Sequence, residues 1–150
     1  MAMSNFEKID ILLVEDNPYD AELSLRALQR KKLANKVEWV QDGADALDFI
    51  FSKGSYAHRA QDEPLKLILL DIKLPKVSGI DVLRKIKEDP VTRAIPVVML
   101  TSSAEEQDLS ECYQLGVNSY IVKPVDFESF QEEVEKAGFY WMLVNRVPVS

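Results

Sequence analysis

The chain of 150 residues contains one cysteine, Cys112, and one histidine, His58. A single cysteine excludes an intramolecular disulfide, and the two residues together cannot form a zinc site built from several cysteine and histidine ligands. A reducing compartment, the cytoplasm, is therefore expected. Only five glycines are present, and no GxxxxGKS or GxGxxG motif occurs. The backbone cradle with which nucleotide-binding modules hold a phosphate chain is thus absent.

Basic residues are also in the minority, with 18 Lys and Arg against 25 Asp and Glu and a net charge of −7. A negative surface disfavours contact with DNA phosphates and anionic lipid headgroups. No apolar run reaches the roughly 18 residues of a membrane-spanning helix, and residues 1–10 lack the pattern of a secretory signal. We therefore expect neither a nucleic-acid partner nor a membrane association.

What the sequence does contain is a regular alternation of short apolar runs and longer stretches of helical period. The runs begin 23 to 31 residues apart and cover residues 10–14, 36–40, 65–70, 96–100 and 119–122. This spacing is close to the length of a βαβ unit, about 30 residues. It predicts a single α/β domain of five parallel strands and five helices, with helices on both faces of the sheet.

Helix-capping residues follow four of these runs. The predicted caps are Asn17, Asp42, Ser78 and Asp126. Pro18 suits the first helical turn, where its missing N–H has no intrahelical partner. The connection over residues 52–64 is longer than the usual helix-to-strand length of about 2–6 residues, and we interpret it as a mobile or functional loop.

Polar side chains stand at the ends of four predicted strands. They are Glu15, Asp16, Asp71, Thr101 and Lys123. The carboxyl ends of parallel strands share one edge of the sheet, so these residues are expected to converge where such folds bind ligands.

Three carboxylates in one small crevice repel one another unless a cation is present. Oxygen ligands suit Mg²⁺, with Mn²⁺ as a plausible substitute. A divalent cation beside an aspartate and a lysine is suited to phosphoryl transfer. Asp71 is then the candidate nucleophile, while Thr101 and Lys123 could each bind a phosphoryl oxygen.

Four motifs at these positions carry a family resemblance. They are LVEDNP at 13–18, LLDIKLPKVSG at 69–79, LTS at 100–102 and YIVKP at 120–124. In order and spacing they resemble the receiver domain of bacterial two-component response regulators, over about residues 10–137. The resemblance implies a flavodoxin-like (βα)5 three-layer sandwich with sheet order 2-1-3-4-5.

The resemblance also implies roles for individual residues. Asp71 would accept a phosphoryl group from the phosphohistidine of a sensor histidine kinase. Asp16, Asp71 and the backbone carbonyl of Lys73 would bind Mg²⁺, and Glu15 would assist through a water molecule. Many members of the family have aspartate at the position of Glu15. This chain departs from them in side-chain length but not in charge.

Two further implications concern the opposite side of the site. Thr101 and Tyr120 would form a switch pair, in which the aromatic ring turns inward when Thr101 closes on the phosphoryl group. The peptide bond between Lys123 and Pro124 would be cis. The loop 52–64, the segment 89–96 and the aromatic tail resemble the single-domain regulators that serve bacterial phytochrome kinases, so a phytochrome is a candidate partner.

The end of the chain is unusually apolar. One helical stripe would suffice for packing on the sheet, but further apolar residues surround it. Trp141 belongs to the stripe, and the additional apolar residues beside it are Phe139, Tyr140, Met142 and Leu143. We expect them to be buried in a homodimer, with burial under the loop 52–64 as the alternative. The chain then divides into an N-terminal extension (1–9), a receiver domain (10–137) and an apolar C-terminal extension (138–150).

The sequence thus predicts a stand-alone response regulator that signals through protein contacts and is not an enzyme. One alternative is a receiver-like scaffold that is never phosphorylated. Another is a Mg²⁺ phosphatase of the haloacid-dehalogenase type, which is disfavoured because Lys73 stands where the second acid of an Asp-x-Asp motif is needed.

Overall fold

The structure, a computed structural model, describes residues 9–29, 36–59, 65–102 and 106–136. Five strands form one parallel sheet, namely β1 (Ile11–Val14), β2 (Val37–Val40), β3 (Leu67–Asp71), β4 (Val97–Thr101) and β5 (Ser119–Val122). Their spatial order is β2-β1-β3-β4-β5. This confirms the predicted 2-1-3-4-5 sheet. The strands match the predicted runs to within two residues, but β3 and β4 include Asp71 and Thr101 as their last residues.

The helices are α1 (Pro18–Leu28), α2 (Gly43–Ile50), α3 (Gly79–Glu88), α4 (Glu106–Gln114) and α5 (Phe127–Lys136). Asn17, Asp42, Ser78 and Asp126 cap four of them, as predicted. Each cap side chain accepts a hydrogen bond from the backbone N–H three residues later, at 2.7 to 3.2 Å. The helix starts are therefore encoded locally.

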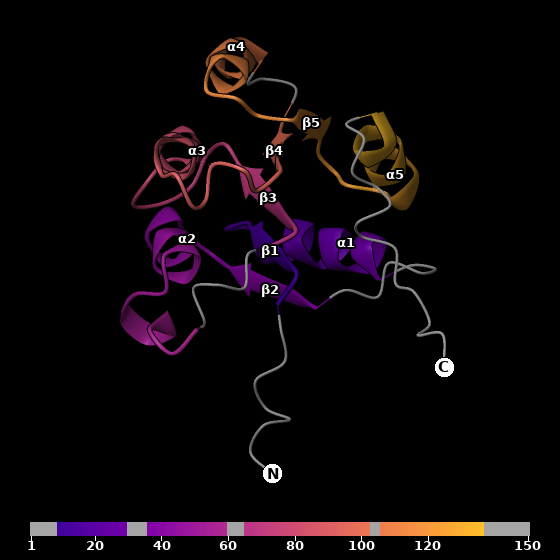
Figure 1. Cartoon of the computed structure of the whole chain (residues 1–150). Coiled ribbons are helices and arrows are strands. Elements are labelled where there is room, and N and C mark those ends of the chain that lie inside the picture. Colours follow the sequence, from indigo (N-terminus) through magenta and orange to yellow (C-terminus); the bar gives the residue numbers. More distant parts are fainter. Residues whose placement is uncertain (1–8, 30–35, 60–64, 103–105, 137–150) are drawn as a thin grey trace, which may run out of the picture.

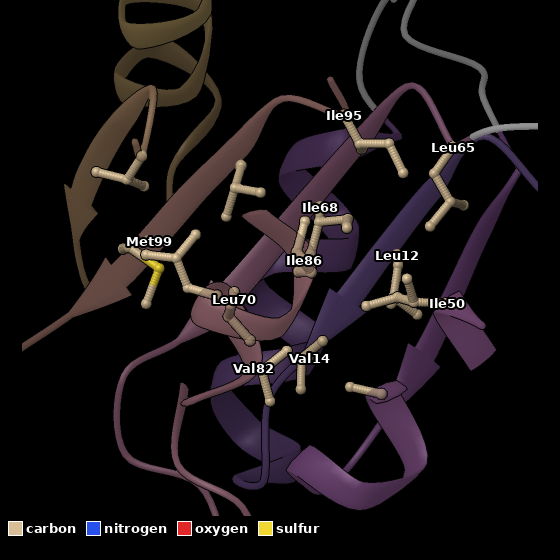
Figure 2. Close-up of a cluster of buried hydrophobic side chains, with 14 of the residues drawn as sticks. Leu12, Val14, Ile50, Leu65, Ile68, Leu70, Val82, Ile86, Ile95 and Met99 are labelled. Carbon is tan, nitrogen blue, oxygen red and sulfur yellow. The ribbon is translucent and has the colours of Figure 1, made fainter. Parts of the chain in front are cut away.

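Helices cover the sheet on both faces. In Figure 1, α1 and α5 lie on one side of the strands, while α2, α3 and α4 lie on the other. Successive residues of β1 point to opposite faces, so Leu12 and Val14 belong to the core under α2, α3 and α4, and Ile11 and Leu13 to the core under α1 and α5. Figure 2 shows the first of these cores, in which Val82 and Ile86 of α3 lie against β1 and β3. Each face of the sheet therefore has its own buried core.

The described part of the long connection folds back onto α2. It contains a 3-10 helix, η2 (Gly54–Tyr56). The ring of Phe49 meets the edge of Tyr56 at a centroid distance of 5.0 Å, and the Arg59 guanidinium lies 3.9 Å from the centroid of the same ring. His58 is exposed, and Cys112 is buried in the core. Among the described helices, none has the length and apolarity to span a bilayer.

Candidate functional site

The strand ends place the predicted residues along one edge of the sheet. The β-ladder continues one residue beyond β1 and β5, because the Glu15 N–H donates to the Val40 carbonyl at 3.1 Å and the Lys123 N–H to the Thr101 carbonyl at 2.8 Å. Asp71 pairs in register with Leu100 of β4. Main-chain hydrogen bonds thus determine where these side chains leave the sheet.

Three carboxylates meet at this edge. Oxygens of Glu15, Asp16 and Asp71 all lie within 4.8 Å of one another. Glu15 and Asp71 are 0% and 2% exposed, whereas Asp16 is exposed. A buried carboxylate pair with an open third member is suited to a hard divalent cation that keeps part of its water. The donor set of the structure therefore fits a metal ion of the Mg²⁺ or Mn²⁺ type.

The Lys123 ammonium lies among these acids. Its Nζ donates to Asp71 Oδ2 at 2.9 Å and to Glu15 Oε1 and Oε2 at 3.3 and 3.4 Å. Burial lowers the pKa of Lys123, but the hydrogen bond to Asp71 and the charges of Asp71 and Glu15 outweigh burial, so the pKa lies above its ordinary value. Lys123 is therefore a permanent cation at physiological pH.

Glu15 is held in an unfavourable environment for its charge. Burial, the larger cause, and the adjoining Asp71 carboxylate together raise its pKa from 4.5 to about 8, against the opposing effects of Lys123 and the Asn17 N–H. That N–H donates to Glu15 Oε2 at 3.2 Å. One ammonium thus compensates the crowded carboxylates only in part, which is a further reason to assign a cation to this site.

The loop between β3 and α3 approaches the site closely. The Gly79 N–H donates to the Ile72 carbonyl at 2.8 Å, and the Lys73 N–H lies 3.4 Å from Asp71 Oδ1. The loop turns at Lys76, whose φ is +70° and whose neighbours are joined by a 2.8 Å hydrogen bond from the Val77 N–H to the Pro75 carbonyl. This is a γ-turn of the rare, strained type.

Contacts with α2 secure that turn. The Gly43 N–H donates to the Pro75 carbonyl at 3.2 Å, and Lys76 Nζ lies 3.5 Å from Asp42 Oδ2. Asp42 therefore both caps α2 and pairs with the turn. A shallow pocket of about 500 Å³ opens beside the carboxylates. Its lining residues are Asp16, Ile72, Lys73, Leu74, Pro75, Ser78 and Ile80.

Thr101 and Tyr120 stand on the neighbouring strands β4 and β5. Thr101 is buried, and its Oγ1 donates to the Ser102 carbonyl at 2.9 Å. Tyr120 is half-buried and packs against the core under α4, where its ring meets Tyr113 edge to face at a centroid distance of 6.3 Å. The Lys123–Pro124 peptide bond is cis.

Two contacts of the site were not predicted from the sequence. Asp20 Oδ2, in the first turn of α1, lies 3.5 Å from Lys123 Nζ. The Trp39 indole N–H donates to the Glu15 carbonyl at 2.8 Å. The only available signal for Asp20 was its place in the first turn of the helix that follows Glu15 and Asp16.

The predicted dimer residues Phe139, Tyr140, Trp141, Met142 and Leu143 lie outside the described residues.

The sheet order together with the acids, hydroxyl and lysine at its carboxyl edge defines the class of protein. The family model of the response regulator receiver domain matches residues 11–135, and the chain belongs to this family. Receiver domains bind a divalent metal ion and pair with sensor histidine kinases in two-component signalling.

Several solved structures of response regulators are similar to this chain in sequence and fold. The bacteriophytochrome response regulator AtBRR is 51% identical, with a TM-score of 0.81, and the match covers 93% of this chain and 99% of that one. The Mn²⁺-bound form of response regulator Rcp1, a protein of Synechocystis sp., is 34% identical over 95% of this chain and 100% of that one, with a TM-score of 0.74. The phosphorylated cyanobacterial phytochrome response regulator RcpA is 38% identical over 90% and 95% of the two chains, with a TM-score of 0.74.

Proposed function

We propose that the chain is a phosphorylation-dependent switch whose phosphoacceptor is Asp71. The observation that carries this proposal is the buried Asp71 carboxylate, 2.9 Å from Lys123 Nζ and clustered with Glu15 and Asp16 at the carboxyl edge of the sheet. The phosphorylated state of the relative RcpA supports it.

The chain's own residues divide the work of phosphoryl transfer. An oxygen of Asp71 attacks the phosphorus atom of the phosphohistidine, the new O–P bond forms as the P–N bond breaks, and the imidazole leaves. Lys123, which now donates to Asp71, turns its ammonium to a phosphoryl oxygen. Thr101 gives up its hydrogen bond to the Ser102 carbonyl and donates its hydroxyl to another phosphoryl oxygen.

Mg²⁺ is the metal that we propose for this site, with Mn²⁺ as a substitute. Asp16, Asp71 and the Lys73 carbonyl would hold it directly, and Glu15 through a water molecule. A bound Mg²⁺ would neutralise charge on the phosphoryl oxygens. The clustered carboxylates and the Mn²⁺-bound form of Rcp1 support this assignment.

Thr101 and Tyr120 then form the output switch. When the Thr101 hydroxyl turns to the phosphoryl group, it frees space into which the Tyr120 ring moves. Tyr120 contacts Tyr113 of α4, so this movement changes the surface formed by α4, β5 and α5. The signal leaves the domain as a protein contact.

Intact-mass spectrometry after incubation with acetyl phosphate tests the acceptor. The wild type should gain the mass of one phosphoryl group in Mg²⁺ and none in EDTA, and Asp71→Asn should gain none in either. Asp81→Asn, which removes an exposed aspartate from the first turn of α3, is the matched control and should behave as the wild type.

An adduct that forms on Asp71→Asn, or on the wild type in EDTA at the same rate, would contradict the assignment. If no adduct accumulates, beryllofluoride binding in Mg²⁺ decides between a short-lived acyl phosphate and a scaffold that is never phosphorylated.

The partner that we propose is a sensor histidine kinase of the phytochrome type. The names of AtBRR and RcpA, both phytochrome-linked response regulators, support this choice. We further propose that the receiver unit spans residues 10–137.

Residues 138–150 would then form the apolar extension that pairs two copies through Phe139, Tyr140, Trp141, Met142 and Leu143. Sedimentation velocity at tens of micromolar should show a dimer. A variant with these five residues replaced by Ser should sediment as a monomer with an unchanged circular dichroism spectrum. A monomeric wild type would contradict the pairing.

A further inference from the structure

Lys123 has a third acidic partner on α1. Asp20 Oδ2 lies 3.5 Å from Lys123 Nζ, compared with 2.9 Å for Asp71 and 3.3 Å for the nearer oxygen of Glu15. The Asp20 side chain is 27% exposed, so it approaches the ammonium from the solvent side of the buried pair. Lys123 is therefore shared among carboxylates of three different segments.

The position of Asp20 also has an ordinary structural use. As the third residue of α1, it donates its N–H to Asn17 Oδ1 at 3.1 Å, and an acid in the first turn interacts favourably with the helix dipole. Asp45 has the same place in α2, where its N–H donates to Asp42 Oδ1 at 2.7 Å. Asp45 is exposed and forms no ion pair with other described residues. Of these two helix-start aspartates, Asp20 alone contacts the lysine of the site. A helix-starting role therefore does not account for its side-chain contact.

We propose that Asp20 is a positioning residue that acts through Lys123 and sets the balance between the two ligands of the site. Asp20 holds the ammonium on the α1 side and competes with a phosphoryl oxygen for it. Its negative charge also favours a divalent cation at the neighbouring carboxylates. Asp20 thus weakens the binding of the phosphoryl group and strengthens the binding of the metal ion. This inference rests on the phosphoacceptor function of Asp71.

Two binding measurements on Asp20→Asn test this balance. Mg²⁺ affinity, measured by isothermal titration calorimetry, should fall about fivefold, because one charge near the cation is lost. Beryllofluoride affinity at saturating Mg²⁺, measured by titration of the intrinsic fluorescence, should rise about fivefold, because Lys123 loses a competing partner. A loss of folding or packing would lower both affinities, so only the proposed role moves them in opposite directions.

Two matched variants complete the design. Asp45→Asn removes an acid from the same position of another helix and should leave both affinities within about twofold of the wild type. Asp20→Glu keeps the charge within reach of Lys123 and should restore both affinities. Urea unfolding of the three variants shows whether each remains folded.

Each outcome decides the matter. If Asp20→Asn changes both affinities in the same direction, or neither, while the wild type binds both probes, Asp20 has no such role and the phosphoacceptor function stands. If Asp45→Asn reproduces the changes, they come from the helix terminus and the proposal is wrong. A wild type that binds neither Mg²⁺ nor beryllofluoride would overturn the phosphoacceptor function and this inference with it.

Discussion

At the scale of single residues, the site is a problem of charge compensation. Glu15 and Asp71 are almost fully buried, and Lys123 is the ammonium that contacts both. Removing one partner from such a cluster leaves the other charges uncompensated, which costs more than the net stabilisation of the intact cluster. The carboxylates therefore contribute binding capacity for a cation and little stability of their own.

The raised pKa of Glu15 predicts a pH dependence of stability in the metal-free protein. Its pKa is about 8 in the folded state and 4.5 as an ordinary glutamate. Between these values the folded state binds more protons than the unfolded state, so the contribution of Glu15 to the free energy of unfolding falls as pH rises. Glu15→Gln should therefore gain stability relative to the wild type between pH 5 and pH 8.5.

Urea unfolding in EDTA at these two pH values measures the effect. Glu22→Gln, which alters an exposed acid paired with Arg26 on α1, should show the same difference from the wild type at both pH values. A difference for Glu15→Gln that also stays constant would contradict an ionisation of Glu15 in this window.

Residue identities at the strand ends could be read from the sequence, but their three-dimensional partners could not. Asp71, Thr101 and Lys123 follow apolar runs, which is a local pattern. The contact of Asp20 with Lys123 depends on the position of the first turn of α1 relative to the residue that follows β5. The turn at Lys76 was also not predicted, because a lysine with positive φ carries no local sequence signal.

At the scale of elements, the first residue of α3 packs directly against the backbone at the end of β3. A Cβ atom on Gly79 would lie 2.0 Å from the Asp71 carbonyl oxygen and 2.8 Å from Ile72 Cα. Both obstacles are backbone atoms, which cannot turn away as a side chain can. Gly79 thus permits the close approach that brings the loop after Asp71 into the site.

Gly79→Ala should therefore cost about 3 kcal/mol or more, because strand or helix must shift. Gly116→Ala should cost about 1–2 kcal/mol, because φ is +99° there but the nearest atom to a Cβ is the flexible Lys87 side chain at 3.8 Å. Urea unfolding compares the two variants. Equal costs would show that space at Gly79 is not limiting.

The ring pair of Tyr113 and Tyr120 joins α4 to β5. The two rings meet edge to face at an interplanar angle of 85°, a geometry that contributes about 0.5–1.5 kcal/mol beyond burial. Tyr113→Ala should destabilise the protein by about 1 kcal/mol and speed amide hydrogen exchange in α4.

Tyr19→Ala is the matched control, since Tyr19 is 69% exposed on α1, and should leave exchange in α4 unchanged. If Tyr113→Ala also leaves it unchanged, Tyr113 does not couple α4 to the switch.

At the scale of the whole molecule, the order of the strands follows from the sequence more completely than the site does. Short apolar runs at regular spacing predicted five parallel strands, and the motifs carried the order 2-1-3-4-5. The alternation of Ile11, Leu12, Leu13 and Val14 between two cores needs no further information than the period of a strand. Side-chain pairing at the carboxyl edge depends instead on helix placement, which no local pattern encodes.

The two layers of helices differ in their relation to the site. α2 secures the loop after β3 through Asp42, while α1 reaches Lys123 through Asp20. α4 contacts Tyr120 through Tyr113. A phosphoryl group on Asp71 would therefore lie close to helices on both faces of the sheet. We expect the change that it causes to emerge mainly at α4 and β5.

Phosphotransfer from a histidine kinase tests this function most directly. A purified sensor histidine kinase of the phytochrome type is first labelled on its histidine and freed of nucleotide, and the chain is then added with Mg²⁺. The label should move from the kinase to the wild-type chain, and it should stay on the kinase with Asp71→Asn or in EDTA. A kinase that keeps its label beside the wild type, while transferring it to an established receiver partner in the same buffer, would contradict phosphoacceptance from a kinase of this type.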